Sequence, residues 1–97
     1  MWHEIILAPE AVQDFKRLKA NDRAKVKDAL EVHQRHDPTK TSRSRIKRLK
    51  DLSQPQYRLR VDTVRFFYDV IDGRVEILAI VAKAKAEDWL AKAGKKS

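Results

Sequence analysis

Residues 57–81 read Tyr-Arg-Leu-Arg-Val-Asp-Thr-Val-Arg-Phe-Phe-Tyr-Asp-Val-Ile-Asp-Gly-Arg-Val-Glu-Ile-Leu-Ala-Ile-Val, a pattern that predicts three antiparallel strands in series. Asp72-Gly73 lies between two apolar runs, and this dipeptide is typical of a two-residue hairpin turn because both central residues need positive φ. If Asp62-Thr63 forms a second two-residue turn, residues 57–61 become the first strand of the sheet. The segments on either side of this sheet complete the fold.

The two turns decide which side chains share a face, because successive residues of a strand point to opposite sides. One face is expected to be apolar and to contain the pairs Val70–Val75, Tyr68–Ile77, Phe66–Ala79 and Val64–Val81, with Tyr57, Leu59 and Val61 beside them. The opposite face is expected to carry Arg58, Arg60, Arg65, Phe67, Asp69, Glu76, Leu78 and Ile80.

The second face has an unfavourable feature, since this register places Arg60 directly across from Arg65. Cross-strand pairs change stability by roughly 0.2–1 kcal/mol, and like charges in such a pair are destabilising. We interpret the pair as part of a phosphate-binding platform, on which Phe67 is available for a nucleobase to stack. The alternative is a set of solvated side chains on an open sheet face.

The composition points to a polyanionic or acidic partner. The 97 residues include 22 Lys and Arg against 14 Asp and Glu, a net charge of +8. Between Lys40 and Arg65 there are nine basic and two acidic residues, so this segment alone contributes +7. A domain this basic is typical of nucleic-acid binding or of an acidic protein partner. The chain has no cysteine, which excludes disulfides and thiolate chemistry.

The remaining segments predict helices around the sheet. A short strand is expected over residues 2–7, then a helix beginning at Pro9 and a second helix capped by Asn21 or Asp22, packed as an antiparallel hairpin. Residues 38–54 are expected to be loop, with a short strand near 46–49. A helix follows from Ala84, and residues 95–97 are expected to fray. We therefore predict one α+β domain over residues 1–97, of order βααβββα, with the helices on one face of a three- to four-stranded antiparallel sheet.

This order and these residues resemble the RelE/ParE superfamily, the toxins of bacterial type II toxin–antitoxin pairs. The resemblance rests on Ile6-Leu7-Ala8-Pro9-Glu10-Ala11, on Ile46-Lys47-Arg48-Leu49, and above all on Tyr57-Arg58-Leu59-Arg60-Val61 followed by Val64-Arg65-Phe66-Phe67-Tyr68-Asp69-Val70. It implies a ribosome-dependent endoribonuclease that cleaves messenger RNA without a metal or another cofactor. The RNA's own 2′-OH attacks and leaves a 2′,3′-cyclic phosphate.

The resemblance also implies site residues. The catalytic candidates are Arg58, Arg60, Arg65, Lys83 and Lys85. The RNA-binding candidates are Arg43, Arg45, Lys47, Arg48, Lys50 and Phe67. A guanidinium suits a phosphate because it is bidentate and permanently charged, and for the same reason it is a poor general base. Where RelE-like chains carry a Gly-Lys-Arg run and then a tyrosine, this chain has Ala82-Lys83-Ala84 and Leu90, so the proton-transfer groups stay open.

The partners that the resemblance implies are an acidic, RelB-like antitoxin, the ribosomal A site and messenger RNA. The toxin–antitoxin complex is expected to be oligomeric and to bind operator DNA through the antitoxin. No apolar run approaches the roughly 18 residues of a membrane span, and Met1-Trp2-His3-Glu4 does not begin a signal peptide, so a cytoplasmic protein is expected. The alternatives are a ParE-like inhibitor of DNA gyrase and a weakened toxin that retains antitoxin binding.

Overall fold

The computed structural model describes residues 2–42 and 45–96, with the side chains of residues 33 and 34 excepted. The chain begins with β1 (Glu4–Leu7) and continues through α1 (Pro9–Arg17), α2 (Ala20–Ala29) and a π-helical turn η1 (Leu30–Gln34). Five strands follow: β2 (Ile46–Arg48), β3 (Leu52–Gln54), β4 (Tyr57–Val61), β5 (Val64–Ile71) and β6 (Arg74–Ala82). A 3-10 turn η2 (Lys83–Lys85), α3 (Ala86–Ala93) and β7 (Lys95–Lys96) complete the chain.

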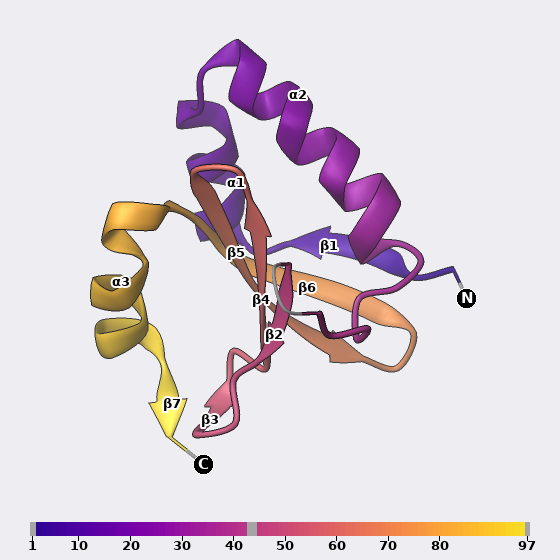
Figure 1. Ribbon diagram of the computed structural model, residues 1–97, viewed down its shortest axis with the longest axis vertical. Coiled ribbons are helices and arrows are strands. Elements are labelled where there is room, and N and C mark those ends of the chain that lie inside the picture. The colour runs from indigo at the N-terminus through magenta and orange to yellow at the C-terminus, as the bar shows by residue number, and fades with distance from the viewer. Residues whose placement is uncertain (1, 43–44, 97) are drawn as a thin grey trace.

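Five of these strands form the main sheet, in the order β1-β6-β5-β4-β2 (Figure 1). The meander β4–β5–β6 is antiparallel, as predicted, and β2 joins β4 in the antiparallel sense. At the other edge β1 runs parallel to β6, so the sheet is mixed. The α+β fold with an N-terminal strand, a helix pair and a C-terminal helix is confirmed. The predicted three- to four-stranded antiparallel sheet was too small, because short strands add at both edges.

Both two-residue hairpin turns form where they were predicted, and positive φ at both central residues is seen at Asp72-Gly73 only. Asp72 and Gly73 have φ of 46° and 78°, and Asp62 has φ of 54°. The β4–β5 register pairs Arg60 with Arg65, which confirms the like-charged pair. The turn requires glycine at position 73, because a residue with a side chain would be strained at this positive φ.

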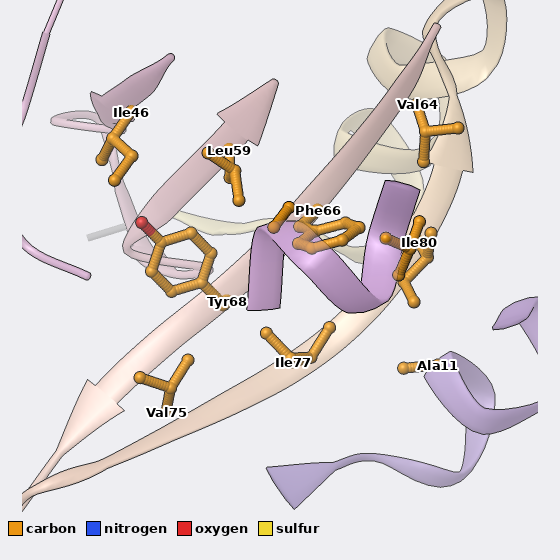
Figure 2. Packing of buried hydrophobic residues seen from close by; sticks show 11 residues of the cluster. Ala11, Ile46, Leu59, Val64, Phe66, Tyr68, Val75, Ile77 and Ile80 are labelled. Atoms are coloured by element: carbon orange, nitrogen blue, oxygen red, sulfur yellow. The ribbon is translucent and has the colours of Figure 1, made fainter. Parts of the chain in front are cut away.

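The β5–β6 register departs from the prediction beyond the first part of the hairpin. A bulge between Tyr68 and Phe67 inserts one extra residue into β6, so Phe66 pairs with Ile80 rather than Ala79 and Val64 pairs with Ala82 rather than Val81. A single inserted residue exchanges the faces of all that follow. Ile80 therefore lies in the core and not on the arginine face. Figure 2 shows Phe66 and Ile80 side by side in this core.

The core lies between the sheet and the helices α1 and α2. Tyr68, Phe66, Leu59, Ile77 and Val75 are fully buried on the sheet side, and Ala11, Val26 and Ala29 enter from the helices. The Tyr68 hydroxyl donates a 2.6 Å hydrogen bond to the Pro38 carbonyl, which ties the segment after η1 to the core. The apolar face predicted from Tyr57, Phe66 and Tyr68 is confirmed.

The helix pair begins slightly differently from the prediction. Pro9 is the first residue of α1, as expected. The cap of α2 is Lys19, so the prediction of Asn21 or Asp22 as cap was wrong by two or three residues. The backbone of Lys19 is extended, and α2 begins at the next residue without a hydrogen bond from a capping side chain. No helix in residues 2–42 and 45–96 is long and apolar enough to cross a membrane.

The C-terminal elements lie apart from the α1–α2 pair (Figure 1). Trp89 of α3 stacks on Phe67, whose side chain belongs to the arginine face. The prediction that all helices cover one face was therefore wrong for α3. Lys95 and Lys96 pair with β3 as a two-stranded sheet, so the prediction of a frayed tail was also wrong for these two residues. Little in the sequence indicates this pairing, because each of the two strands is only two or three residues long.

Candidate functional site

Four basic side chains share one face of the sheet across three neighbouring strands. Residues that lie directly opposite in an antiparallel pair project to the same side. Arg60 of β4 is opposite Arg65 of β5, and Arg58 of β4 is opposite Lys47 of β2. Ile46, the neighbour of Lys47, is buried in the core on the other side, which agrees with Lys47 pointing away from the helices. We call Lys47, Arg58, Arg60 and Arg65 the basic face.

The three arginines of the basic face influence one another electrostatically. Burial, followed by the charge of Arg60, lowers the pKa of Arg58 below its usual value. Burial likewise lowers the pKa of Arg65, with Arg60 and Arg58 adding to the effect. No carboxylate contributes to either shift. Neighbouring positive charge therefore acts on Arg58 and Arg65 with no carboxylate of the described residues offsetting it, and an anion bound among the arginines would relieve the repulsion.

The three arginines differ in how open they are. Arg60 is exposed and Arg58 is half-buried. The Nε atom of Arg58 is buried and is the one such side-chain nitrogen or oxygen without a hydrogen-bond partner in the described part of the chain. Arg65 is only 4% exposed, and its Nη1 donates to the Asp62 and Val64 carbonyls at 2.8 and 2.9 Å. The hairpin backbone thus orients Arg65, while Arg58 as a whole is the more exposed of the two side chains.

Phe67 lies on the basic face, in register with Arg58, but it is not open. Its side chain is fully buried, and the Trp89 ring stacks on it at a centroid distance of 4.8 Å and an interplanar angle of 8°. The indole nitrogen of Trp89 donates to Glu10 Oε2 at 2.7 Å, which links α3 to α1. The prediction of Phe67 as a base-stacking platform is therefore wrong for this conformation, because α3 occupies the position of the base.

The carboxylates beyond Phe67 have local partners. Asp69 is 3% exposed and accepts hydrogen bonds from the Gln56 backbone N–H and from Gln54 Nε2, both at 2.8 Å. It therefore fixes the segment that precedes β4, and no cationic side chain in the described part of the chain pairs with it. Glu76 does have one, because Arg74 Nε lies 3.1 Å from its Oε1.

Arg45, Arg48 and Lys50, which were also predicted to bind RNA, are not in register with the arginines of this face. Arg48 lies over the Tyr57 ring, 5.1 Å from its centroid, and donates to the Gln56 carbonyl at 3.0 Å. Together with Lys50, and with Lys47 of the basic face, it lines an open cavity of about 680 Å³ along β2. Arg45 lines a cavity of about 410 Å³ with residues of α2. Arg43 is outside the described residues.

The two lysines predicted to be catalytic follow β6 and diverge. The Lys83 backbone N–H donates to the Thr63 carbonyl at 2.8 Å, beside the β4–β5 turn. Its cavity is lined by Leu18, Val64 and other residues from the helix side of the sheet. Lys85 lines a groove of about 780 Å³ between α1, β6 and α3, together with Asp14, Arg17 and Trp89. The structure therefore places neither lysine in register with the arginines.

The same groove contains a partly buried contact that the sequence did not indicate. Strand β1 covers β6 only as far as Ile77, and Asp14 of α1 accepts a hydrogen bond from the Ile80 N–H at 3.0 Å. The carboxylate thus replaces a missing strand partner. Burial raises the pKa of Asp14, and Glu10 adds to the rise, while the Ile80 hydrogen bond and Arg17 oppose it.

A metal site is a separate possibility that the donor set does not support. Within residues 2–42 and 45–96 no group of three or more histidine, aspartate or glutamate side chains lies close enough together to hold an ion. What the described residues do provide is three arginines on one sheet face, two of which have no carboxylate acting on them, and such a set is suited to binding phosphate. The arginines of the basic face stay protonated under ordinary conditions and therefore cannot act as proton acceptors.

Comparison with solved structures agrees with this fold. The chain superposes on the toxin–antitoxin complex RelBE2 from Mycobacterium tuberculosis with a TM-score of 0.72 and 20% identity, covering 84% of this chain and 99% of that one. The RelB–RelE complex from Methanococcus jannaschii gives 0.67 and 20%, covering 87% and 96%. The free E. coli toxin RelE, in a mutant form, gives 0.54 and 20%, covering 96% and 95%. No family profile and no curated protein sequence matches the chain. The fold is RelE-like.

Proposed function

We propose that this protein is the toxin of a type II toxin–antitoxin pair and that it inhibits translation by cleaving messenger RNA in the ribosomal A site. The single observation that carries the proposal is the convergence of Arg58, Arg60 and Arg65 on one sheet face without a carboxylate acting on Arg58 or Arg65. The RelE-like fold supports it, because the similar chains were solved as toxins or in toxin–antitoxin complexes.

The proposed reaction needs three functions from the protein. Charge must be stabilised on the equatorial phosphate oxygens, a base must take the 2′-OH proton, and the departing 5′-oxygen must be protonated. Arg65, oriented by two backbone carbonyls, and the half-buried Arg58 are suited to the phosphate oxygens. Arg60 is exposed beside them and binds the neighbouring part of the RNA backbone. Lys83 and Lys85 stay predictions for proton transfer.

The chain's charge supports the proposed partners. A net charge of +8 suits both the ribosome with its message and an acidic, RelB-like antitoxin that neutralises the toxin. We place the protein in the cytoplasm, where both partners are found, and propose that the toxin–antitoxin complex is oligomeric and binds operator DNA through the antitoxin. These assignments follow from the proposed function.

One observation favours a second candidate. Trp89 covers Phe67, and Arg65 is almost buried, so this conformation offers neither the Phe67 ring nor most of Arg65 to a nucleotide. A chain that keeps the fold but binds another target, such as DNA gyrase, or a weakened toxin that only binds its antitoxin, would not need an open face.

Induction of the chain alone in a bacterial host tests the proposal. We expect growth to stop, and co-expression of the antitoxin encoded beside it to restore growth. Primer extension on cellular transcripts after induction should then show new 5′ ends at fixed codon positions in translated regions. Purified protein should cut messages on programmed ribosomes and leave free RNA intact. Growth arrest with intact transcripts and broken DNA would establish gyrase poisoning instead, and unaffected growth would contradict every toxin assignment.

A further inference from the structure

Strand β6 has an outer edge that its neighbouring strand covers only in part. Strand β1 pairs with β6 from Arg74 to Ile77, and the Ala8 N–H donates to the Ile77 carbonyl where β1 ends. Strand β6 continues to Ala82, and over these last residues β5 is its only strand partner in the described part of the chain. An uncovered strand edge presents backbone N–H and C=O groups with which another strand can pair.

The direction of the backbone groups at this edge follows from three hydrogen bonds. The Ile80 N–H points away from β5, because it donates to the Asp14 carboxylate of α1 at 3.0 Å. Residues two apart in a strand point the same way, so the Ala82 N–H also points outward, whereas the Lys83 N–H turns back to the Thr63 carbonyl. No hydrogen bond within residues 2–42 and 45–96 engages the Ala82 N–H on its outward side. Ala82 is exposed, so this donor is open to a partner.

Asp14 occupies the position that a carbonyl of the next strand would take. A strand paired with this edge would bond the Ile80 N–H, the Ile80 carbonyl and the Ala82 N–H in succession, whereas the Asp14 side chain serves the first of these alone. Burial disfavours the charged form of Asp14 and raises its pKa. A peptide carbonyl would satisfy the Ile80 N–H without holding a carboxylate at a partly buried position.

The edge lies in a groove that can hold an extended chain. The groove has a volume of about 780 Å³ and is bounded by α1, the end of β6 and α3, with Leu18 and Trp89 among its apolar side chains. A second cavity, of about 530 Å³, shares Leu18 and Ala82 with the first and continues to Thr63 at the β4–β5 turn. The two together follow the uncovered part of β6 and pass its end.

The charge of the groove indicates which kind of chain it suits. Arg17, Lys85 and Lys92 line it, all three are exposed, and none belongs to an ion pair among the described residues. The carboxylates in the groove are Asp14, which is turned to the Ile80 N–H, and Asp88. The unpaired cations therefore favour a segment with acidic side chains, whose apolar side chains contact Leu18 and Trp89.

We propose that the outer edge of β6, from Ile80 to Ala82, binds an extended acidic segment of a partner protein, which adds to the sheet as a short strand and replaces the Asp14 carboxylate at the Ile80 N–H. In such an addition main-chain hydrogen bonds give affinity, and contacts of alternate side chains give specificity. RNA does not fit this edge, because it lacks the regularly spaced N–H and C=O groups of a strand. The partner is the antitoxin, an identification that rests on the proposed function.

Replacing Ala82 with proline tests the edge directly. Ala82 has φ −64° and ψ 145°, a backbone that proline adopts, so the substitution removes the outward N–H with little strain. By isothermal titration with the antitoxin encoded beside the toxin, we expect Ala82→Pro to bind about tenfold or more weakly. Ala82→Ser keeps the N–H and is the matched control, which should bind like the wild type. Asp14→Ala removes the competing carboxylate and should bind about two- to tenfold more tightly.

Amide hydrogen exchange gives a second readout on the unmodified protein. The Ala82 amide should exchange rapidly in the free toxin and become protected in the complex. An amide that stays unprotected in a tight complex, or wild-type affinity in Ala82→Pro, would place the antitoxin elsewhere and overturn the proposal. If Ala82→Pro melts below the wild type, the exchange result on the wild type decides.

The outcome is separable from the proposed nuclease. Ala82→Pro should cleave messages on programmed ribosomes at the wild-type rate, since it changes only the outer edge of β6. A wild type that binds the antitoxin with a protected Ala82 amide but cuts no message would refute the nuclease and leave this edge assigned. A wild type that cuts messages but binds no antitoxin would refute the edge assignment and leave the nuclease.

Discussion

Replacing Trp89 with alanine tests whether α3 holds the basic face partly closed. The contact has two parts in the structure: the indole ring stacks on the fully buried Phe67, and its nitrogen donates to Glu10. Helix α3 has only eight residues, too few to be stable in isolation. Its attachment to the sheet face therefore depends strongly on Trp89.

The expected magnitude follows from the burial of the two rings. Truncating a fully buried aromatic side chain to alanine costs about 3–5 kcal/mol. Trp89 is half-buried, so we expect about half of that range, roughly 2 kcal/mol, of which the stacking geometry itself accounts for about 0.5–1.5 kcal/mol. In a domain of this size a loss of 1 kcal/mol lowers the melting temperature by about 4–8 °C, so the variant should melt roughly 10 °C lower.

The assay is equilibrium unfolding in urea together with amide hydrogen exchange. Trp89→Ala should lower the free energy of unfolding and make the amides of α3 exchange faster than those of β5. Trp89→Phe is the matched control: it keeps an aromatic ring over Phe67, loses the bond to the exposed Glu10, and should cost less than about 1 kcal/mol. An unchanged free energy of unfolding and unchanged protection of α3 in Trp89→Ala would refute the conclusion that this stack attaches the helix.

Three further predictions address the site and the fold. Arg60→Gln should lower the slope of log affinity against log salt for single-stranded RNA by about 0.7, because one phosphate contact is lost, whereas Lys27→Gln on α2 should leave the slope unchanged in the same titration. Asp14→Asn keeps an oxygen for the Ile80 N–H but removes the titration. Because burial raises the folded-state pKa of Asp14, the wild type loses stability as the pH rises through that value. Urea unfolding at two pH values should therefore show the variant to be the more stable protein at pH 7. Below the ordinary pKa of 3.8 the variant should have no advantage. Gly73→Ala should cost about 1–2 kcal/mol because φ at this position is +78°, and an unchanged melting temperature would contradict the left-handed turn.

Local patterns were enough to predict the centre of the fold. The Asp72-Gly73 turn and the alternation of β4 and β5 depend on neighbouring residues, and they correctly placed Arg60 opposite Arg65. The same reasoning failed at the bulge between Tyr68 and Phe67, because period-two alternation assumes an unbroken ladder. The single inserted residue moved Ile80 from the predicted basic face into the core.

The sequence by itself determined the concentration of positive charge and the arginines of the central strands, since both follow from composition and strand periodicity. Tertiary structure alone decided what surrounds them. Trp89 reaches Phe67, and Lys47 comes into register with Arg58, only through contacts between segments distant in the chain. Local propensity carries no information about such contacts, because the packing of the whole sheet and its helices selects them.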